Sequence, residues 1–159
     1  MMRVLAFICA LVAPLPAFAL SCLAPSVERS FARADAAEER YVVVHGRLTL
    51  DAKALPRGGS GEVQPPEMTQ VKAVLLGKSL NLEGFKVPFD QEITLEVACF
   101  GPWCGSVQNG LDVLAFVRKE GEAYALDVNP CGGSVFGAPQ RSMLRAVKTC
   151  MRGGDCTAD

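Results

Sequence analysis

The clearest alternation of hydrophobic and polar positions lies near the middle of the chain. Apolar residues at 93, 95 and 97 alternate with smaller or more polar residues at 94, 96 and 98, which is the period of a half-buried strand. A sharp turn at Gly101-Pro102 follows, between Cys99 and Cys104, and it carries Trp103, the only tryptophan. The pattern predicts one edge of a small all-β domain, with a clipped loop that presents a large aromatic side chain.

Four further segments have the pattern of strands. Residues 41–50 contain a run of three valines, and residues 68–76 form a second strand. Residues 111–117 are almost entirely apolar, which is typical of a strand buried on both faces. A polar turn at 118–122 leads into a strand at 124–128, so this pair is predicted to be a hairpin with a solvated tip. Residues 77–90 are predicted to be irregular, apart from a short strand near 80–82.

Two helices flank the strands. The first begins after Pro25-Ser26, with Ser26 as its N-cap, and its apolar stripe consists of Val27, Phe31 and Ala34. The second is predicted to close the chain, with Pro139 at its first position and Gly153-Gly154 after its end. Its apolar stripe consists of Leu144, Val147 and Met151.

These elements predict an all-β fold with one N-terminal and one C-terminal helix. Five strands with turn signals between them favour a small closed or nearly closed barrel, and a sandwich is the alternative. The segment from Asp51 to Pro66 is rich in glycine and proline, and it is expected to be a long loop.

The first 19 residues have the features of a secretory signal peptide. Arg3 precedes the apolar run Val4–Val12, and Ala17-Phe18-Ala19 is an A-x-A cleavage site, so the mature chain is expected to be a single domain of residues 20–159. A lipoprotein would carry its lipid on Cys22, but Ala19 at the third position before it makes a poor lipobox. The prediction is therefore a periplasmic or secreted protein without a membrane segment after cleavage.

Charge and cysteine content refine this picture. The predicted mature chain has 15 basic and 17 acidic residues and no run of like charges, which argues against nucleic acid or anionic lipid as a partner. It has six cysteines, an even number that indicates disulfides in an oxidising compartment but leaves their pairing open. The spacings C-x4-C and C-x5-C and a single histidine, His45, are unlike a zinc site, so no metal or other cofactor is expected.

Three other motifs offer little catalytic chemistry. His45 has no neighbouring nucleophile or second histidine, and it is expected to be an ordinary strand residue. Gly77-Lys78-Ser79 ends like a phosphate-binding loop, but Lys72 stands where the earlier glycine is required. Cys99 and Cys104 lack the C-x-x-C spacing of redox pairs, so a structural disulfide is favoured over a redox protein.

The order of several short segments resembles that of the netrin-like domain, which occurs in tissue inhibitors of metalloproteinases and in bacterial exported proteins. The matching segments are Ser21–Pro25, Ser30–Asp35, Val42–Arg47, Cys104-Gly105, Val113–Phe116 and Cys131. The resemblance covers about residues 20–135, and the closing helix and tail at 136–159 fit it too. It implies an OB-fold barrel of five strands.

The resemblance also implies a pairing of the cysteines. The family opens with C-x-C, whereas this chain has Leu20-Ser21-Cys22, so the first family cysteine is absent. Cys22 then takes the role of the second family cysteine and bridges to Cys131. Cys99 replaces the missing partner of Cys104, and Cys150 pairs with Cys156.

The function that the resemblance implies is binding of a protein without catalysis. In the family's inhibitors, the amine and carbonyl of the first cysteine bind the zinc of a metalloproteinase; here only Leu20 could offer an amine, so inhibition is the lesser alternative. The candidate binding rim consists of Leu20, Ser21, Leu23, Phe100 and Trp103, and its two segments are expected to meet at one end of the barrel. A lone tryptophan in a small domain is mostly buried, which favours Trp103 packed over the barrel end rather than exposed as a contact residue.

Overall fold

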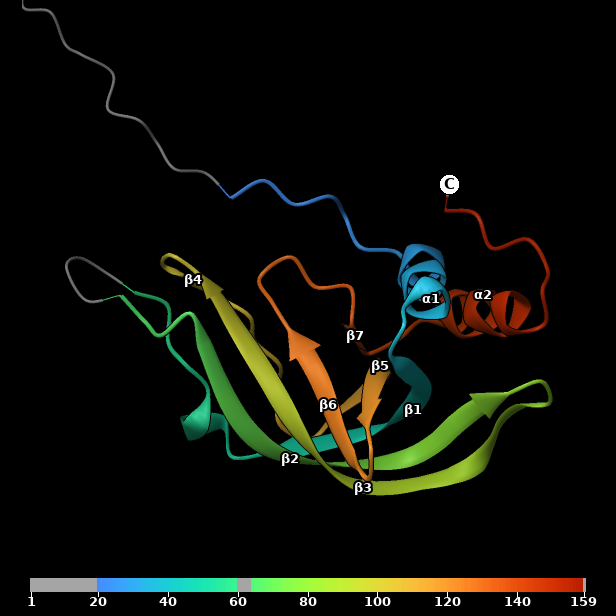
Figure 1. The fold of residues 1–159 in the computed structure, drawn as a ribbon, viewed down its shortest axis with the longest axis horizontal. Coiled ribbons are helices and arrows are strands. Elements are labelled where there is room, and N and C mark those ends of the chain that lie inside the picture. The colour runs from blue at the N-terminus through green and yellow to red at the C-terminus, as the bar shows by residue number, and fades with distance from the viewer. Residues whose placement is uncertain (1–19, 60–63, 159) are drawn as a thin grey trace, which may run out of the picture.

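Five long strands form a ring-like sheet in the computed structural model, which describes residues 20–59 and 64–158 (Figure 1). The predicted signal peptide, residues 1–19, and the middle of the predicted loop at 51–66 lie outside the described residues. The elements in chain order are α1 (Val27–Ala36), β1 (Arg40–Leu50), the 3-10 turn η1 (Ala52–Ala54), β2 (Met68–Asn81), β3 (Gly84–Phe100), β4 (Trp103–Cys104), β5 (Leu111–Glu120), β6 (Ala123–Val128), β7 (Val135–Gly137) and α2 (Arg141–Met151).

The five long strands follow a closed path. The order is β1-β2-β3-β6-β5, and β5 pairs in turn with β1 from Arg40↔Lys119 to Leu48↔Leu111. All these pairings are antiparallel except β3 with β6, which runs parallel from Thr94↔Ala125 to Val97↔Val128. The predicted all-β class with two flanking helices is confirmed, and the closed path differs from the two separate sheets of a sandwich.

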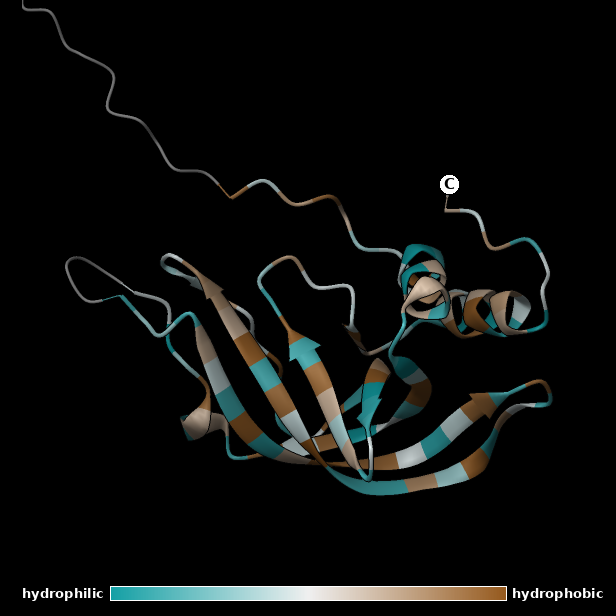
Figure 2. Cartoon of the chain, viewed as in Figure 1, coloured by the Kyte–Doolittle hydropathy of each residue, from teal (hydrophilic) through white to brown (hydrophobic). Residues whose placement is uncertain are grey.

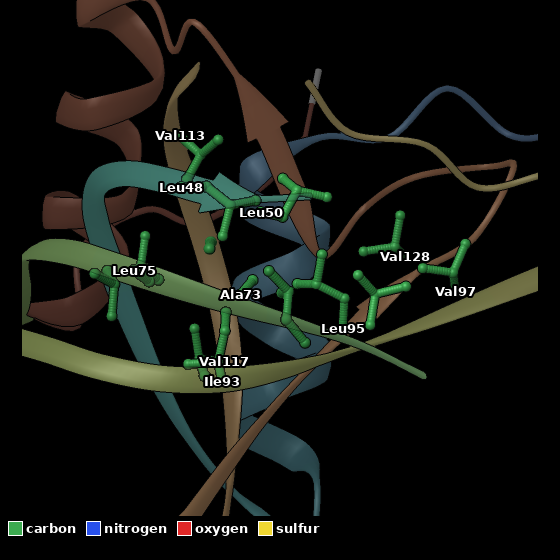
Figure 3. Close-up of a cluster of buried hydrophobic side chains, with 14 of the residues drawn as sticks. Leu48, Leu50, Ala73, Leu75, Ile93, Leu95, Val97, Val113, Val117 and Val128 are labelled. Carbon is green, nitrogen blue, oxygen red and sulfur yellow. The ribbon is translucent and has the colours of Figure 1, made fainter. Parts of the chain in front are cut away.

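The inside of the ring is filled by aliphatic side chains from all five long strands (Figure 3). They come from alternate positions, since successive side chains of a strand point to opposite faces, and Figure 2 shows the resulting bands of hydrophobic and hydrophilic residues along β3. Those with no more than 2 % exposure include Val44, Leu48, Leu75, Ile93, Leu95, Val97, Val113, Val117 and Leu126. This inner core holds the strands in register, because a slip of one residue would turn these side chains outward.

A second core lies outside the ring, beneath the two helices. Leu114 and Phe116 of β5 are buried there together with Val27 of α1 and Val147 of α2. Since neighbouring positions of β5 point into the inner core, β5 is buried on both faces, as its apolar run predicts. The hairpin of β5 and β6 is also confirmed.

The prediction that residues 77–90 are irregular is wrong. β2 continues to Asn81 and β3 begins at Gly84, so the segment is a hairpin that extends beneath α2, with a shift in register between Ser79 and Leu80 (Figure 1). Gly77 resembled a break, but it faces Gly46 of β1 so closely that a Cβ on either residue would collide with the backbone of the other strand. Pro88 lies where β3 pairs with β2 alone, a position where a strand tolerates proline.

The helix boundaries largely follow the predicted signals. Ser26 caps α1, since its side chain accepts a hydrogen bond from the backbone N–H of Arg29 at 3.2 Å. The predicted start of the second helix is wrong by two residues, because α2 begins at Arg141 with Gln140 as its N-cap and Pro139 precedes the cap. Short β4 and β7 were not predicted, since two or three residues are too few to show a period.

Three disulfides join Cys22 to Cys131, Cys99 to Cys104, and Cys150 to Cys156. These are the pairs that the resemblance implied. The first connects the segment before α1 to the loop after β6, across 109 positions of sequence, whereas the other two span five and six positions. Three disulfides indicate an oxidising location outside the cytoplasm.

The three disulfides are expected to differ in their contribution to stability. Replacing Cys22 and Cys131 together by serine should lower the free energy of unfolding by about 2–5 kcal/mol, because this bridge closes the longest loop of the unfolded chain. Replacing Cys150 and Cys156 together should cost less, since only a short terminal loop is released. Chemical denaturation of the two double variants checks this order; equal losses would contradict it.

Candidate functional site

The loop between β3 and β4 is a tight hairpin with two exposed aromatic side chains. Phe100 pairs with Trp103 across the hairpin, and the disulfide joins the next pair, Cys99 and Cys104. Gly101 has a φ of 60°, the left-handed conformation that this turn requires. The disulfide and the turn therefore fix the backbone on which Phe100 and Trp103 stand.

Trp103 is more exposed than its sequence context favoured. The exposed fraction of its surface is 38 %, and that of Phe100 is 45 %. Trp103 belongs to neither hydrophobic core, and more than a third of its surface is exposed, so it does not fill the barrel end as a fully buried side chain would. Trp103 is thus a surface residue held by a rigid turn.

Met68 extends this aromatic surface. It lies at the start of β2, is 52 % exposed, and lines a shallow groove together with Phe100 and Glu67. The backbone N–H of Cys99 donates a hydrogen bond to the carbonyl of Glu67 at 2.8 Å, which fixes β2 beside the hairpin. Met68, Phe100 and Trp103 are called the rim patch below.

In the N-terminal half of the predicted rim, Leu23 lines a different groove from Phe100. Leu20, Ser21 and Leu23 are exposed, Leu23 at 77 %, on the segment that the Cys22–Cys131 disulfide fastens beside α1. Leu23 and Phe100 line two different grooves, with residues of α1 between them. The structure thus pairs Phe100 with Trp103, and it places Leu23 at a groove that adjoins the groove beside Phe100.

The groove beside Phe100 has a volume of about 300 Å³ and lies between α1 and the outer face of β3 and β6. Its apolar lining includes Met68, Phe100 and Phe116, and its polar lining includes Glu96, Asp127 and Arg33. We call it the aromatic groove. Its volume is that of a small ligand pocket or of a few side chains of a bound chain.

Arg118 holds the carboxylates of this groove in place. Its guanidinium donates hydrogen bonds to Glu96 at 2.7 Å, to Glu120 at 2.8 Å and to both oxygens of Asp127 at 3.0 and 3.1 Å. Burial alone would lower the pKa of Arg118, but these hydrogen bonds outweigh it and raise the pKa above its ordinary value. The prediction that Arg118 belongs to a solvated hairpin tip is wrong, since its side chain is only 16 % exposed.

A second groove of about 290 Å³ continues from the first along α1. It lies between the N-terminal segment and the loop after β6, and its lining includes Leu23, Arg29 and Cys131. We call it the arginine groove. Both grooves are lined by Ser30, Arg33, Asn129 and Gly133, so they adjoin, and together they are called the depression along α1.

Sequence reasoning missed most residues of these grooves. Arg29 and Arg33 stand four positions apart on a helix, which places them on one face and is a readable signal. Glu96 and Asp127 carry no signal of their own, because each reads as the polar position of an alternating strand. Only the parallel pairing of β3 with β6, where Glu96 faces Asp127, brings them together.

The other candidate residues in the described part of the chain do not form a catalytic or metal site. His45 lies in β1, as predicted, and its Nε2 is 2.9 Å from a carboxylate oxygen of Asp112 on the neighbouring strand. The described residues contain no group of three or more His, Cys, Asp or Glu side chains arranged to hold a metal ion. Neither of the described helices has the length and apolar character needed to cross a membrane.

Comparison of the chain with known protein families, with curated proteins and with solved structures finds no match. The fold and the site define the protein as a mostly β domain with three disulfides, an exposed aromatic hairpin and an adjoining groove.

The exposure of Trp103 predicts a small effect on stability. Trp103→Ala should lower the free energy of unfolding by about 1–2 kcal/mol, less than the ~3–5 kcal/mol typical of a fully buried aromatic side chain. Leu95→Ala, in the inner core, serves as the control and should cost about 2–5 kcal/mol. Denaturant titration measures both, and a loss for Trp103→Ala as large as that for Leu95→Ala would contradict its position at the surface.

Arg118 is expected to stabilise this face of the sheet. Arg118→Met should lower the free energy of unfolding by about 1–3 kcal/mol, because Glu96 and Asp127 would lose their common partner while partly buried. Exposed Arg47, for which the described part of the chain shows no ion pair, provides the control Arg47→Met with a change below about 0.5 kcal/mol. Equal effects of the two substitutions in denaturant titrations would refute this role.

Proposed function

We propose that the chain is an exported netrin-like module with an OB-fold barrel that binds a protein without catalysing a reaction. The observation that carries the proposal is the rim patch, an exposed apolar surface on a hairpin that a disulfide clips. The partner belongs to the same oxidising compartment, the periplasm or the extracellular medium.

The path of the strands supports the netrin-like assignment. An OB-fold is a small Greek-key barrel of five strands, and here five long strands follow a closed path in which β3 and β6 are parallel. The Cys22–Cys131 disulfide occupies the place of the family's bridge between the N-terminus and the segment after the final strand. The two helices pack on the outside of the ring, as the closing helix of the family does.

The physical properties of the rim patch support a role in binding. Tryptophan is enriched among residues that contribute most to protein interfaces, and methionine and phenylalanine are enriched there too. The hairpin is fixed by Cys99–Cys104 before any partner arrives, so little conformational entropy is lost on binding. Exposed apolar side chains that adjoin one another on a rigid surface typically mark an interaction site.

Inhibition of a metalloproteinase through the mature N-terminus is the second candidate. Leu20 lies two residues before Cys22, and the disulfide to Cys131 anchors it to the domain. A free amine at Leu20 would therefore be tethered, although Leu20 itself is exposed. A thiol redox function has less support, because all six cysteines of the described chain are paired.

Quantitative capture of partners from periplasmic or culture-medium fractions tests the proposal. We expect Trp103→Ala and Phe100→Ala each to weaken capture by about 30-fold or more, since truncating a central aromatic contact costs 2 kcal/mol or more, by the order of magnitude found at interfaces. Leu82→Ala is the matched control, because Leu82 is a large apolar residue that is 68 % exposed at the distant hairpin tip. Immobilised protein and mass spectrometry of the captured proteins provide the measurement.

An N-terminal extension separates the two candidates. One residue added before Leu20 should leave capture by the rim patch unchanged, whereas an inhibitor that acts through its terminal amine would lose it. Unchanged capture by both aromatic variants would show that the rim patch is not the binding surface.

A further inference from the structure

We infer that the depression along α1 binds an extended segment of a partner protein that carries an apolar side chain and, within about four residues, an Asp or Glu side chain. This inference rests on the proposed function and specifies the chemistry of the partner. The observation behind it is that the aromatic groove and the arginine groove adjoin along α1 and share Arg33.

The arginine groove has positive charge without a matching carboxylate. Arg29 donates a hydrogen bond to the carbonyl of Ala24, and Arg33 donates one to the carbonyl of Gly133 at 3.1 Å. Within the part of the chain that the structure describes, neither arginine forms an ion pair. A guanidinium has five N–H donors, so each arginine keeps donors for another acceptor.

The carboxylates nearby leave this positive charge in place. Glu96 and Asp127 line the aromatic groove, where Arg118 neutralises part of their charge, and no Asp or Glu among the described residues lines the arginine groove. Glu28 and Asp35, the carboxylates of α1 itself, line neither groove. The charge left over at the arginine end is therefore positive, and an incoming carboxylate complements it with charge-assisted hydrogen bonds.

The geometry of α1 sets the form of the ligand. Arg29 and Arg33 lie on one face of the helix, about 6 Å apart along its axis. Phe100 lines the aromatic groove and belongs to the rim patch as well. A chain in extended conformation advances about 3.3 Å per residue, so one short segment along α1 can place an apolar side chain at the aromatic groove and a carboxylate at Arg29 in the adjoining arginine groove.

The two chain segments that face α1 across the arginine groove are held in place by covalent and hydrogen bonds, which favours a preformed site. The Cys22–Cys131 disulfide joins the N-terminal segment to the loop after β6, and the bonds of Arg29 and Arg33 fasten both to α1. Walls held in this way need little ordering when a ligand binds. The two arginines thus support the groove through one donor each and present the others to a ligand.

Selection of peptides from a displayed random library on the disulfide-bonded protein tests the inference. We expect the selected peptides to be enriched in Asp or Glu within four residues of an aromatic or aliphatic residue. Arg29→Gln/Arg33→Gln should weaken their binding by about tenfold or more, and high salt should weaken it as well. Arg29→Lys/Arg33→Lys, which keeps the charge, should retain part of the affinity.

Arg141→Gln/Arg145→Gln is the matched control. These two arginines are also exposed and four positions apart, but they lie on α2, so the variant makes the same change in net charge away from the grooves. It should change peptide affinity less than about twofold. Thermal melting of every variant confirms that the fold is retained.

Each alternative result overturns the inference. Three results would contradict it. The selected peptides could show no enrichment in acidic residues, or no selected peptide could bind the protein better than Arg29→Gln/Arg33→Gln. The control Arg141→Gln/Arg145→Gln could also lose as much peptide affinity as that variant. If Trp103→Ala abolishes capture of natural partners while Arg29→Gln/Arg33→Gln leaves that capture intact, the rim patch remains the binding surface and only the groove assignment fails.

Discussion

The structure depends on the burial of β5 on both of its faces. One set of its side chains, including Val113 and Val117, fills the inside of the ring, and the other set, Leu114 and Phe116, lies beneath the helices. The two cores therefore share this strand as a common wall. Because α1 packs on the outer face of that wall, its position relative to β3 and β6 is fixed as well, and the grooves beside it follow from the same packing.

Much of the fold could be predicted from local patterns, and the exceptions have physical causes. Local signals were sufficient to predict β3, β5 and the start of α1. These signals are the alternation along β3, the apolar run of β5 and the cap at Ser26, and each arises from residues within a short stretch of sequence. Gly77 misled the prediction, because a glycine needed for close approach of two strands looks the same in sequence as a glycine that ends a strand.

The candidate site was less predictable than the fold. Phe100 and Trp103 were identifiable, since they flank a turn between two cysteines. Glu96, Asp127 and Arg118 belong to three different strands, so their network exists only after the ring has closed. Arg33 lines both grooves, and nothing in the local sequence relates it to Gly133, one hundred positions later.

Closure of the ring between β1 and β5 has a consequence for the order of folding. This pairing joins residues about 70 positions apart, such as Val44 and Ala115, whereas β2 with β3 and β5 with β6 are local hairpins. Local hairpins form within microseconds, and pairings between distant segments are slower because they pay a larger entropy of loop closure. We therefore expect the two hairpins to form before β1 pairs with β5, so that the ring closes late in folding.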